Sequence, residues 1–168
     1  MATAIATLAP RSILDFGCGE AFLVDRLLER GATLDGYVGV DLRADALDEA
    51  RARLPAFEFV ATDVLFWTPA QRFDLVLASQ VLEHLHEPEH YLARLRNLCS
   101  GRMLLTVPLE PWFRLLNLAR GRDVLRLGNH PEHVNHWSLE SFSAFVGARA
   151  AVIRAWTVFP FVFLLAQP

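Results

Sequence analysis

The chain has 168 residues, of which 53% are hydrophobic and 21% are charged, and its formal net charge is −3. This length predicts one domain with a core of its own, and the apolar content excludes an intrinsically disordered chain. Every basic residue is an arginine, which excludes P-loop lysine chemistry and Schiff-base catalysis. The slightly acidic balance argues against a broad nucleic-acid-binding face.

The composition also bears on the cellular compartment. Two cysteines, Cys18 and Cys99, are too few for a disulfide framework, which favours a reducing environment. The N-terminal segment MATAIATLAPRS lacks the basic start and long apolar core of a secretory signal. The longest apolar run, residues 155–166, is shorter than the roughly 20 residues that cross a bilayer. We therefore expect a cytoplasmic protein without a transmembrane segment.

Short β-like runs alternate with amphipathic helical patterns along the chain, which is typical of a parallel α/β sheet. The expected strands are residues 12–16, 37–40, 57–61, 73–78, 103–107, 150–158 and 161–165. The expected helices are residues 20–30, 45–54, 88–98, 112–119 and a last one capped by Ser138 that ends near Gly147. Pro160 favours a tight turn, so the last strand should run antiparallel to its neighbours. No repeat or linker is visible, and one domain is expected over residues 1–168.

The strongest functional signal is the loop DFGCGEA, residues 15–21, between the first strand and the first helix. Its glycines let backbone N–H groups approach a ligand, with a helix N-terminus behind them. Asp41 and Asp63 end the second and third strands, at the sheet edge where open α/β folds bind ligands. A carboxylate at Asp41 can accept both ribose hydroxyls of a nucleoside, although a helix cap is the alternative. Together these signals indicate a nucleoside site.

Two nucleoside-binding families fit such a loop. A dinucleotide fingerprint GxGxxG needs a third glycine where this chain has Phe22, which disfavours a dehydrogenase. Four segments, in order, resemble motifs of the class I S-adenosylmethionine (SAM)-dependent methyltransferases: DFGCGEA, GYVGVDLRADALDEARARL, VATD and FDLVLASQVLEHLHEPEHYLARL. Ala21 departs from the family's last glycine. The resemblance covers nearly the whole chain and implies a Rossmann-like α/β fold. Its seven-stranded, mostly parallel sheet would have helices on both faces and an antiparallel last strand.

The same resemblance implies a cofactor site for SAM, with S-adenosyl-L-homocysteine (SAH) as product. The residues implied to hold the methionine portion are Asp15, Gly17, Cys18 and Gly19, with Ser79 and Gln80 beside the transferable methyl group. Those implied at the nucleoside are Asp41 at the ribose and Leu42, Asp63 and Val64 at the adenine. Cys18 is interpreted as a small residue tolerated in the turn rather than as a reactive thiol.

Histidines follow the fourth strand and recur in the loop HPEHVNHWS, residues 130–138. A hydroxyl acceptor usually needs a base, and the candidates are His84, His133 and His136, with His86, His90 and His130 as further histidines. Alternatively, the imidazoles bond to the backbone in a loop that caps the domain. The series His130, His133 and His136 has no helix signal and is broken by Pro131, so it does not match a zinc helix motif.

A metal site is a further alternative for these residues. Glu83, His84 and His133 resemble the ligands of the small-RNA 3′-end 2′-O-methyltransferases and partly those of ubiquinone-pathway O-methyltransferases. Gln80 stands where those families have an acid, and it is a poorer ligand for a hard cation. We therefore expect no metal.

Residues 110–137 are expected to form an insert on the substrate side. Its helix, residues 112–119, carries aromatic and leucine side chains beside arginines. It is interpreted as a helix packed on the domain, a lid over an apolar substrate, or a weak amphipathic contact with a membrane surface. The segment before the first strand is short, so an acceptor site would be open or closed by this insert or by a partner.

The expected function is methyl transfer from SAM to a small-molecule or glycolipid-like hydroxyl. Because binding an acceptor close to the sulfonium supplies most of the acceleration, little covalent help is required. The alternatives are a non-catalytic SAM-binding module that acts with a partner and a metal-assisted RNA 2′-O-methyltransferase. The acceptor and the oligomeric state do not follow from the sequence, and nucleic acid is disfavoured by the net charge.

Overall fold

The computed structural model describes residues 1–168 except 124–126, 128–129 and 131, so the predicted break at Pro131 lies outside the described residues. The strands are β1 Ser12–Phe16, β2 Gly36–Asp41, β3 Glu58–Ala61, β4 Phe73–Ser79, β5 Cys99–Pro108, β6 Ala151–Val158 and β7 Phe161–Gln167. The helices are α1 Ala2–Leu8, α2 Phe22–Glu29, α3 Ala44–Arg53, α4 Pro88–Leu98, α5 Trp112–Ala119 and α6 Leu139–Gly147, with a 3₁₀ turn η1 at Leu82–His84.

The strands form one seven-stranded sheet in the order β3-β2-β1-β4-β5-β7-β6. Neighbours from β3 to β5 pair in parallel, whereas β7 is antiparallel to both β5 and β6, which confirms the fold class expected from the sequence. The chain leaves β3 at one end of the sheet and re-enters at β4, on the other side of β1. Ligands bind in such sheets where the strand order reverses, at the carboxyl ends of the strands.

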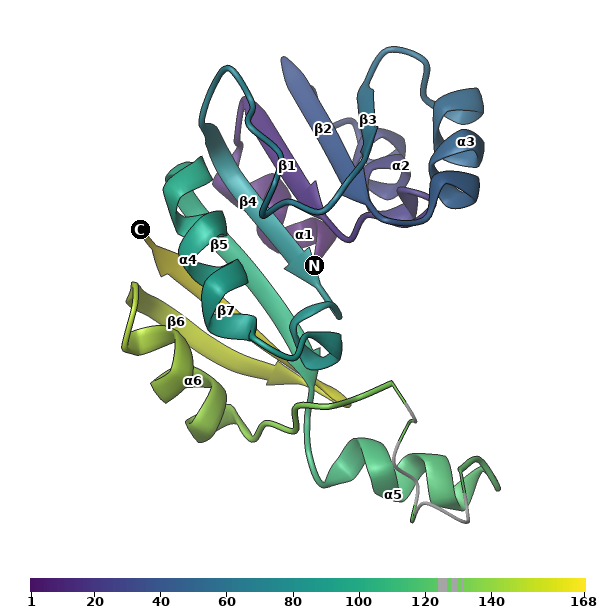
Figure 1. Ribbon diagram of the computed structural model, residues 1–168, viewed down its shortest axis with the longest axis vertical. Coiled ribbons are helices and arrows are strands. Elements are labelled where there is room, and N and C mark those ends of the chain that lie inside the picture. The colour runs from purple at the N-terminus through teal and green to yellow at the C-terminus, as the bar shows by residue number, and fades with distance from the viewer. Residues whose placement is uncertain (124–126, 128–129, 131) are drawn as a thin grey trace.

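Helices cover both faces of the sheet (Figure 1). Helices α1, α2 and α3 bury apolar side chains against one face, and α4 and α6 bury theirs against the other. The stripe Leu92, Leu95 and Leu98 of α4 points inward as its spacing predicted. Ser138 caps α6 by accepting a hydrogen bond from the backbone N–H of Ser141, also as predicted.

The sequence analysis missed α1. This helix buries a single side chain, Ile5, which packs beside Val24 and Leu27 of α2. One buried residue leaves no apolar periodicity to detect, so no helix was expected before the first strand. Strand β5 is also longer than expected, because it follows α4 without a loop. At Gly101 the strand passes so close to β4 that a Cβ would lie 2.3 Å from the carbonyl oxygen of Asp74.

Helix α5 departs from the other helices because it extends past the carboxyl edge of the sheet, at the bottom of Figure 1. Asn117 is its single fully buried residue, and Phe113 contacts the rings of His133 and Phe161. Among the described residues, none of the helices combines the length and apolar character that a membrane-spanning segment requires.

Candidate functional site

A cavity of about 640 Å³ lies at the carboxyl edge of the sheet, where β1 and β4 diverge. Its walls come from the glycine loop, the ends of β2, β3 and β4, the turn η1 and α4. Six residues of the predicted cofactor set line it: Gly17, Gly19, Asp41, Leu42, Asp63 and Gln80. The structure therefore brings together residues that lie up to 63 positions apart in the chain.

The glycine loop turns sharply from β1 into α2. The N–H of Gly17 donates to the carbonyl of Val40 at 2.7 Å, and Gly17 and Gly19 have φ angles of +71° and +53°. Only glycine adopts such angles without cost. A Cβ at Gly17 would also lie 2.3 Å from Cγ2 of Val81, because that side chain packs directly on the loop. Position 17 therefore requires glycine for two independent reasons.

Two carboxylates border the cavity. Asp41 accepts hydrogen bonds from the N–H of Gly19 at 2.8 Å and of Arg43 at 2.9 Å, so it lies directly against the glycine loop. Asp63 accepts from the hydroxyl of Tyr91 at 2.8 Å and from the N–H of Leu65 at 2.9 Å. Burial and the bond to Asp63 raise the pKa of Tyr91 to about 12, so its phenol remains a donor. The sequence analysis did not identify Tyr91, because α4 is distant from β3 in the chain.

Four residues of the predicted cofactor set do not line the cavity. Val64 is buried in the core, and burial raises the pKa of the Cys18 thiol, as expected for an unreactive residue of a turn. Ser79 bonds to the hydroxyl of Thr106 on β5, with 3.1 Å between the two oxygens. Asp15 is buried and accepts a hydrogen bond from the hydroxyl of Tyr37 at 2.9 Å.

The buried Asp15 makes stability depend on pH. Burial raises its pKa to about 7, against the opposing effect of the Tyr37 bond. Because a carboxyl in an unfolded chain titrates near about 3.9, the folded protein holds an extra proton between these values. We expect the free energy of unfolding to fall as pH rises from 4 to 7, by at most about 1.4 kcal/mol per pH unit. Denaturant titrations of Asp15→Asn, which keeps an acceptor for Tyr37, should show a flatter pH profile than the parent. Parallel profiles would contradict this expectation.

Gln80 has an unusual backbone at the end of β4. Its φ of +59° is in the left-handed region, which costs free energy for a residue with a Cβ. Thr106 holds the residue there: its carbonyl accepts from the N–H of Gln80 at 3.0 Å, and its hydroxyl accepts from the Gln80 side-chain amide, also at 3.0 Å. The next residue, Val81, packs on Gly17 as a result. Strained residues of this kind are concentrated at functional sites.

His84 and His133 come together at the rim of the cavity, with ring centroids 4.8 Å apart. Nδ1 of His84 lies 3.1 Å from the carbonyl oxygen of Glu132. Since a carbonyl oxygen can only accept, Nδ1 is the donor in this bond, which leaves Nε2 as the nitrogen with the free electron pair whenever the imidazole is neutral. Burial lowers the pKa of His133 to about 4, with His84 as the next cause, so its imidazole is neutral at pH 7.

Backbone and side-chain bonds fix this pairing. The N–H groups of Val134 and Asn135 donate to the carbonyl of Glu83 at 2.9 and 3.0 Å. The side-chain amide of Asn135 donates to the carbonyls of Leu82 and Leu85 at 3.2 and 2.5 Å. Asn135 thus positions the histidine loop on η1, and the sequence analysis missed this role.

Glu83 completes a group of three ligating side chains. It is buried, and its Oε2 atom has no hydrogen-bond partner among the described residues. Burial raises the pKa of Glu83 to about 8. One ligand atom from each of Glu83, His84 and His133 can be chosen so that all lie within 4.8 Å of one another.

The other candidate histidines lie apart from this group, except for His130. The ring of His130 is 4.9 Å from that of His133. His136 is exposed and interacts electrostatically with Glu110, and His86 and His90 are exposed on the surface. Of the three predicted catalytic histidines, the structure therefore brings together His84 and His133.

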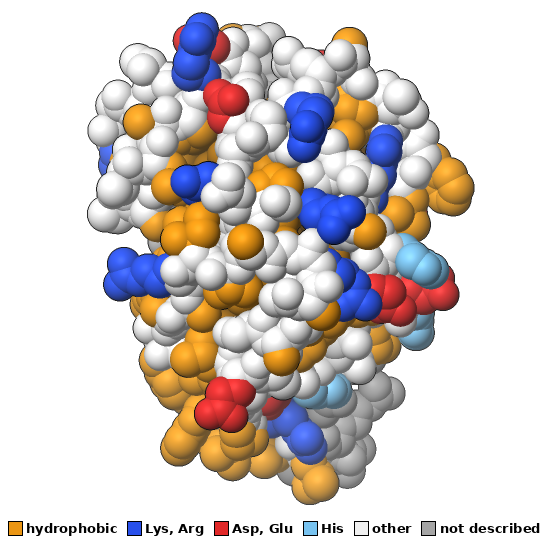
Figure 2. All heavy atoms as spheres, turned by 90° about the vertical axis from the view of Figure 1, so that its left-hand side faces the viewer, with side chains coloured by type: hydrophobic (Ala, Val, Ile, Leu, Met, Phe, Trp, Pro, Cys, Tyr) orange, Lys and Arg blue, Asp and Glu red, His pale blue; other side chains and the backbone are white. Residues whose placement is uncertain are grey.

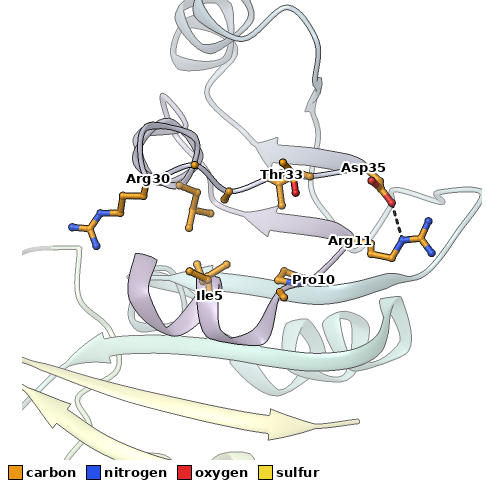
Figure 3. Close-up of a pocket in the computed structure, with 12 residues that line it drawn as sticks. Ile5, Pro10, Arg11, Arg30, Thr33 and Asp35 are labelled. Atoms are coloured by element: carbon orange, nitrogen blue, oxygen red, sulfur yellow. Dashed lines mark hydrogen bonds and ion pairs between the residues drawn. The ribbon is translucent and has the colours of Figure 1, made fainter.

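A second cavity, of about 430 Å³, lies at the opposite edge of the sheet between α1 and the end of α2. Figure 3 shows Ile5 and Pro10 on one side of this cavity and Arg30 pointing away from it. Its charged pair, Arg11 and Asp35, is joined at 2.7 Å and lies at the surface. Several of the predicted site residues line the cavity at the carboxyl edge, and none of them lines this second cavity.

Comparisons with known proteins agree with that geometry. A protein family described as methyltransferase domain matches residues 1–149 of this chain. The chain belongs to the class I SAM-dependent methyltransferases. Trans-aconitate 2-methyltransferase of Rhodopseudomonas palustris (strain BisB5) is 37% identical over 97 residues, which cover 58% of this methyltransferase chain and 36% of the relative. The corresponding protein of Azoarcus sp. (strain BH72) is 34% identical over 121 residues, 69% of this chain and 47% of the relative. The chain spans less than half the length of either relative.

Solved structures share the fold of this methyltransferase. The methyltransferase domain of bacterial CtHen1 aligns over 99% of this chain and 94% of its own, with a TM-score of 0.76 and 18% identity. N-methyltransferase NodS from Bradyrhizobium japonicum WM9, solved in complex with SAH, aligns over 99% of this chain and 84% of its own. Its TM-score is 0.71 at 14% identity.

Proposed function

We propose that this chain binds SAM in the cavity at the carboxyl edge and transfers its methyl group to the hydroxyl of a small-molecule acceptor, leaving SAH. The observation that carries the proposal is Asp41, whose carboxylate lies 2.8 Å from the N–H of Gly19 inside that cavity. In this arrangement Asp41 binds the ribose hydroxyls, and the glycine loop admits the methionine portion of the cofactor. Asp63 and Leu42 line the same cavity, and in the proposed complex they contact the adenine.

Histidines at the rim of the cavity can remove a proton from the acceptor. Methyl transfer from a sulfonium needs the acceptor atom close and aligned, and a hydroxyl acceptor must also lose its proton. His133 is neutral at pH 7, so its imidazole can accept that proton, as a weaker base than an ordinary histidine because its pKa is lowered to about 4. His84 contacts it at the rim of the cavity. The curated relatives are named for trans-aconitate, a small carboxylic acid, which supports a small molecule as the acceptor class.

An SAH-release assay with hydroxyl and carboxylic-acid acceptors tests this function. For a hydroxyl acceptor, we expect His133→Gln to lower kcat by about 100-fold or more, because general-base catalysis contributes that much. SAH affinity should not change. The matched control is His90→Ala, an exposed histidine of α4 outside the cavity. Turnover of the His133→Gln protein at the parent rate would remove His133 from the mechanism, and failure of the folded parent to bind SAH would overturn the function itself.

The unpartnered Oε2 atom of Glu83 favours a second candidate, a methyl transfer assisted by a divalent metal. Two imidazoles and one carboxylate suit Mn²⁺, Fe²⁺ or Zn²⁺ better than Mg²⁺, and Gln80 nearby is a neutral oxygen donor. When bound, such an ion would act as a Lewis acid that lowers the pKa of an acceptor hydroxyl. Glu83, His84 and His133 would hold it.

Calorimetric titration with Mn²⁺ separates the two candidates. The metal-assisted function requires saturable Mn²⁺ binding that Glu83→Gln abolishes and turnover that EDTA removes. Turnover that is unchanged by EDTA supports His133 as the base. Glu89→Gln, a change at a glutamate of α4, serves as the matched control for the loss of a carboxylate.

A further inference from the structure

Four apolar side chains project into solvent at the end of the molecule where α5 extends past the sheet. Trp112 and Leu115 belong to α5 and are 52% and 49% exposed, and Val158 and Phe159 at the β6–β7 turn are 54% and 59% exposed. We call these four residues the apolar tip. The rings of Trp112 and Phe159 meet edge to face with centroids 6.4 Å apart, so two elements form one continuous surface. Figure 2 shows hydrophobic side chains gathered at this lower end of the molecule.

The opposite side of α5 faces the functional site. Phe113 lies 5.3 Å from the ring of His133 and 6.4 Å from that of Phe161. The N–H of Leu109, just before α5, donates to the carbonyl of Pro160 in the β6–β7 turn at 2.9 Å. Helix α5 therefore has one apolar side toward the histidines and another toward solvent. Packing against the domain explains why the first side is apolar, but it does not explain why the solvent-exposed side is apolar too. Exposed aromatic groups of this kind mark an interaction surface.

Arginines accompany the apolar tip on the segment that carries α5. Arg114, Arg120 and Arg122 lie on α5 or just after it, and neither of the two exposed ones, Arg120 and Arg122, forms an ion pair with a described residue. The carboxyl oxygens of Glu110 are buried, so this carboxyl group does not project into solvent beside the apolar tip. Exposed cationic groups at the end of the helix that carries Trp112 and Leu115 match an anionic lipid headgroup region above acyl chains. A second copy of the chain would instead place the same arginines opposite one another in a twofold interface.

We propose that the apolar tip docks on an anionic lipid surface, with Trp112 and Phe159 inserted at the interface and Arg120 and Arg122 at the phosphates. This docking orients the carboxyl edge of the sheet, with His133 behind Phe113, toward the bilayer. The inference concerns binding and does not depend on which acceptor is methylated.

Sedimentation of the whole chain with vesicles tests the proposal. We expect the protein to bind vesicles of phosphatidylcholine with phosphatidylglycerol, to bind phosphatidylcholine vesicles weakly, and to dissociate as salt is added. Trp112→Ala combined with Phe159→Ala should weaken binding about tenfold or more, through loss of inserted apolar area. Arg120→Gln combined with Arg122→Gln should weaken it by a similar factor on anionic vesicles alone.

Phe66→Ala is the matched control, because Phe66 is exposed in the segment between β3 and β4, outside the apolar tip. It should bind vesicles as the parent does. SAH titration of each variant shows whether it is folded. The same titration separates the two proposals: if the parent binds vesicles but not SAH, the proposed methyltransferase function is wrong and the docking proposal stands. The docking proposal is wrong if the parent does not bind anionic vesicles or if the Trp112/Phe159 variant binds them equally well. It is also wrong if that variant instead converts a dimer into a monomer in sedimentation velocity.

Discussion

Asp41→Ala should reduce SAH affinity by about 100-fold or more. Hydrogen bonds to a charged group contribute about 1.5–3 kcal/mol each, and two ribose hydroxyls donate to this carboxylate in the proposed complex. The Gly19 N–H donates to one oxygen of the Asp41 carboxylate at 2.8 Å, which places that oxygen at the glycine loop. Isothermal titration with SAH measures the effect directly.

Two further variants of aspartate sharpen this result. Asp41→Asn keeps one acceptor oxygen without the charge, so its affinity should lie between those of the parent and Asp41→Ala. Asp35→Ala removes a carboxylate of the same type at the amino edge, where Asp35 pairs with Arg11, and should leave SAH affinity unchanged. If the affinity of Asp41→Ala matches that of the parent, the ribose is bound elsewhere. Unfolding curves without ligand show whether loss of the Gly19 bond alone disturbs the loop.

Gly17→Ala should be much more destabilising than Gly19→Ala, although both glycines have positive φ. At Gly19 the added methyl group meets open space, so only the backbone cost of about 1 kcal/mol applies. At Gly17 it would lie 2.3 Å from Val81, and relief of such an overlap costs a further 1–3 kcal/mol or so. We therefore expect a loss of about 2–4 kcal/mol in the free energy of unfolding for Gly17→Ala.

The contact with Val81 can be tested separately. Val81→Ala should recover part of the stability lost in Gly17→Ala, because it removes the atoms that overlap. In the Gly19→Ala background the same change should bring no recovery. Denaturant unfolding of the single and double variants forms a double-mutant cycle, and additive effects at positions 17 and 81 would contradict the packing explanation.

The sequence predicted the features that depend on short segments. The strands and most helices follow from local apolar patterns, and the glycine loop, Asp41 and Asp63 follow from where those strands end. Residues 132–137 lie at the same edge because their segment follows the carboxyl end of β5 and binds η1 through Asn135. These predictions succeed because parallel strands with right-handed connections leave few possible arrangements.

The remaining features depend on contacts between distant segments. Asn135 bonds to the carbonyls of Leu82 and Leu85, more than 45 residues earlier, and nothing in its own neighbourhood reveals these partners. The left-handed backbone of Gln80 depends likewise on Thr106 of the next strand. Whether the apolar side of α5 would face the core or solvent also could not be read from its periodicity, because a stripe of leucines and aromatics is the same in both cases.

The antiparallel direction of β7 has a practical consequence for handling this protein. Phe161 pairs with Pro108 at the carboxyl edge, whereas Ala166 pairs with Met103 toward the amino edge. Any polypeptide attached after Pro168 therefore begins on the side away from the cavity at the carboxyl edge and from α5, as the label C in Figure 1 illustrates. An affinity tag or a tether to a sensor surface at that position leaves the cavity and the apolar tip facing solution.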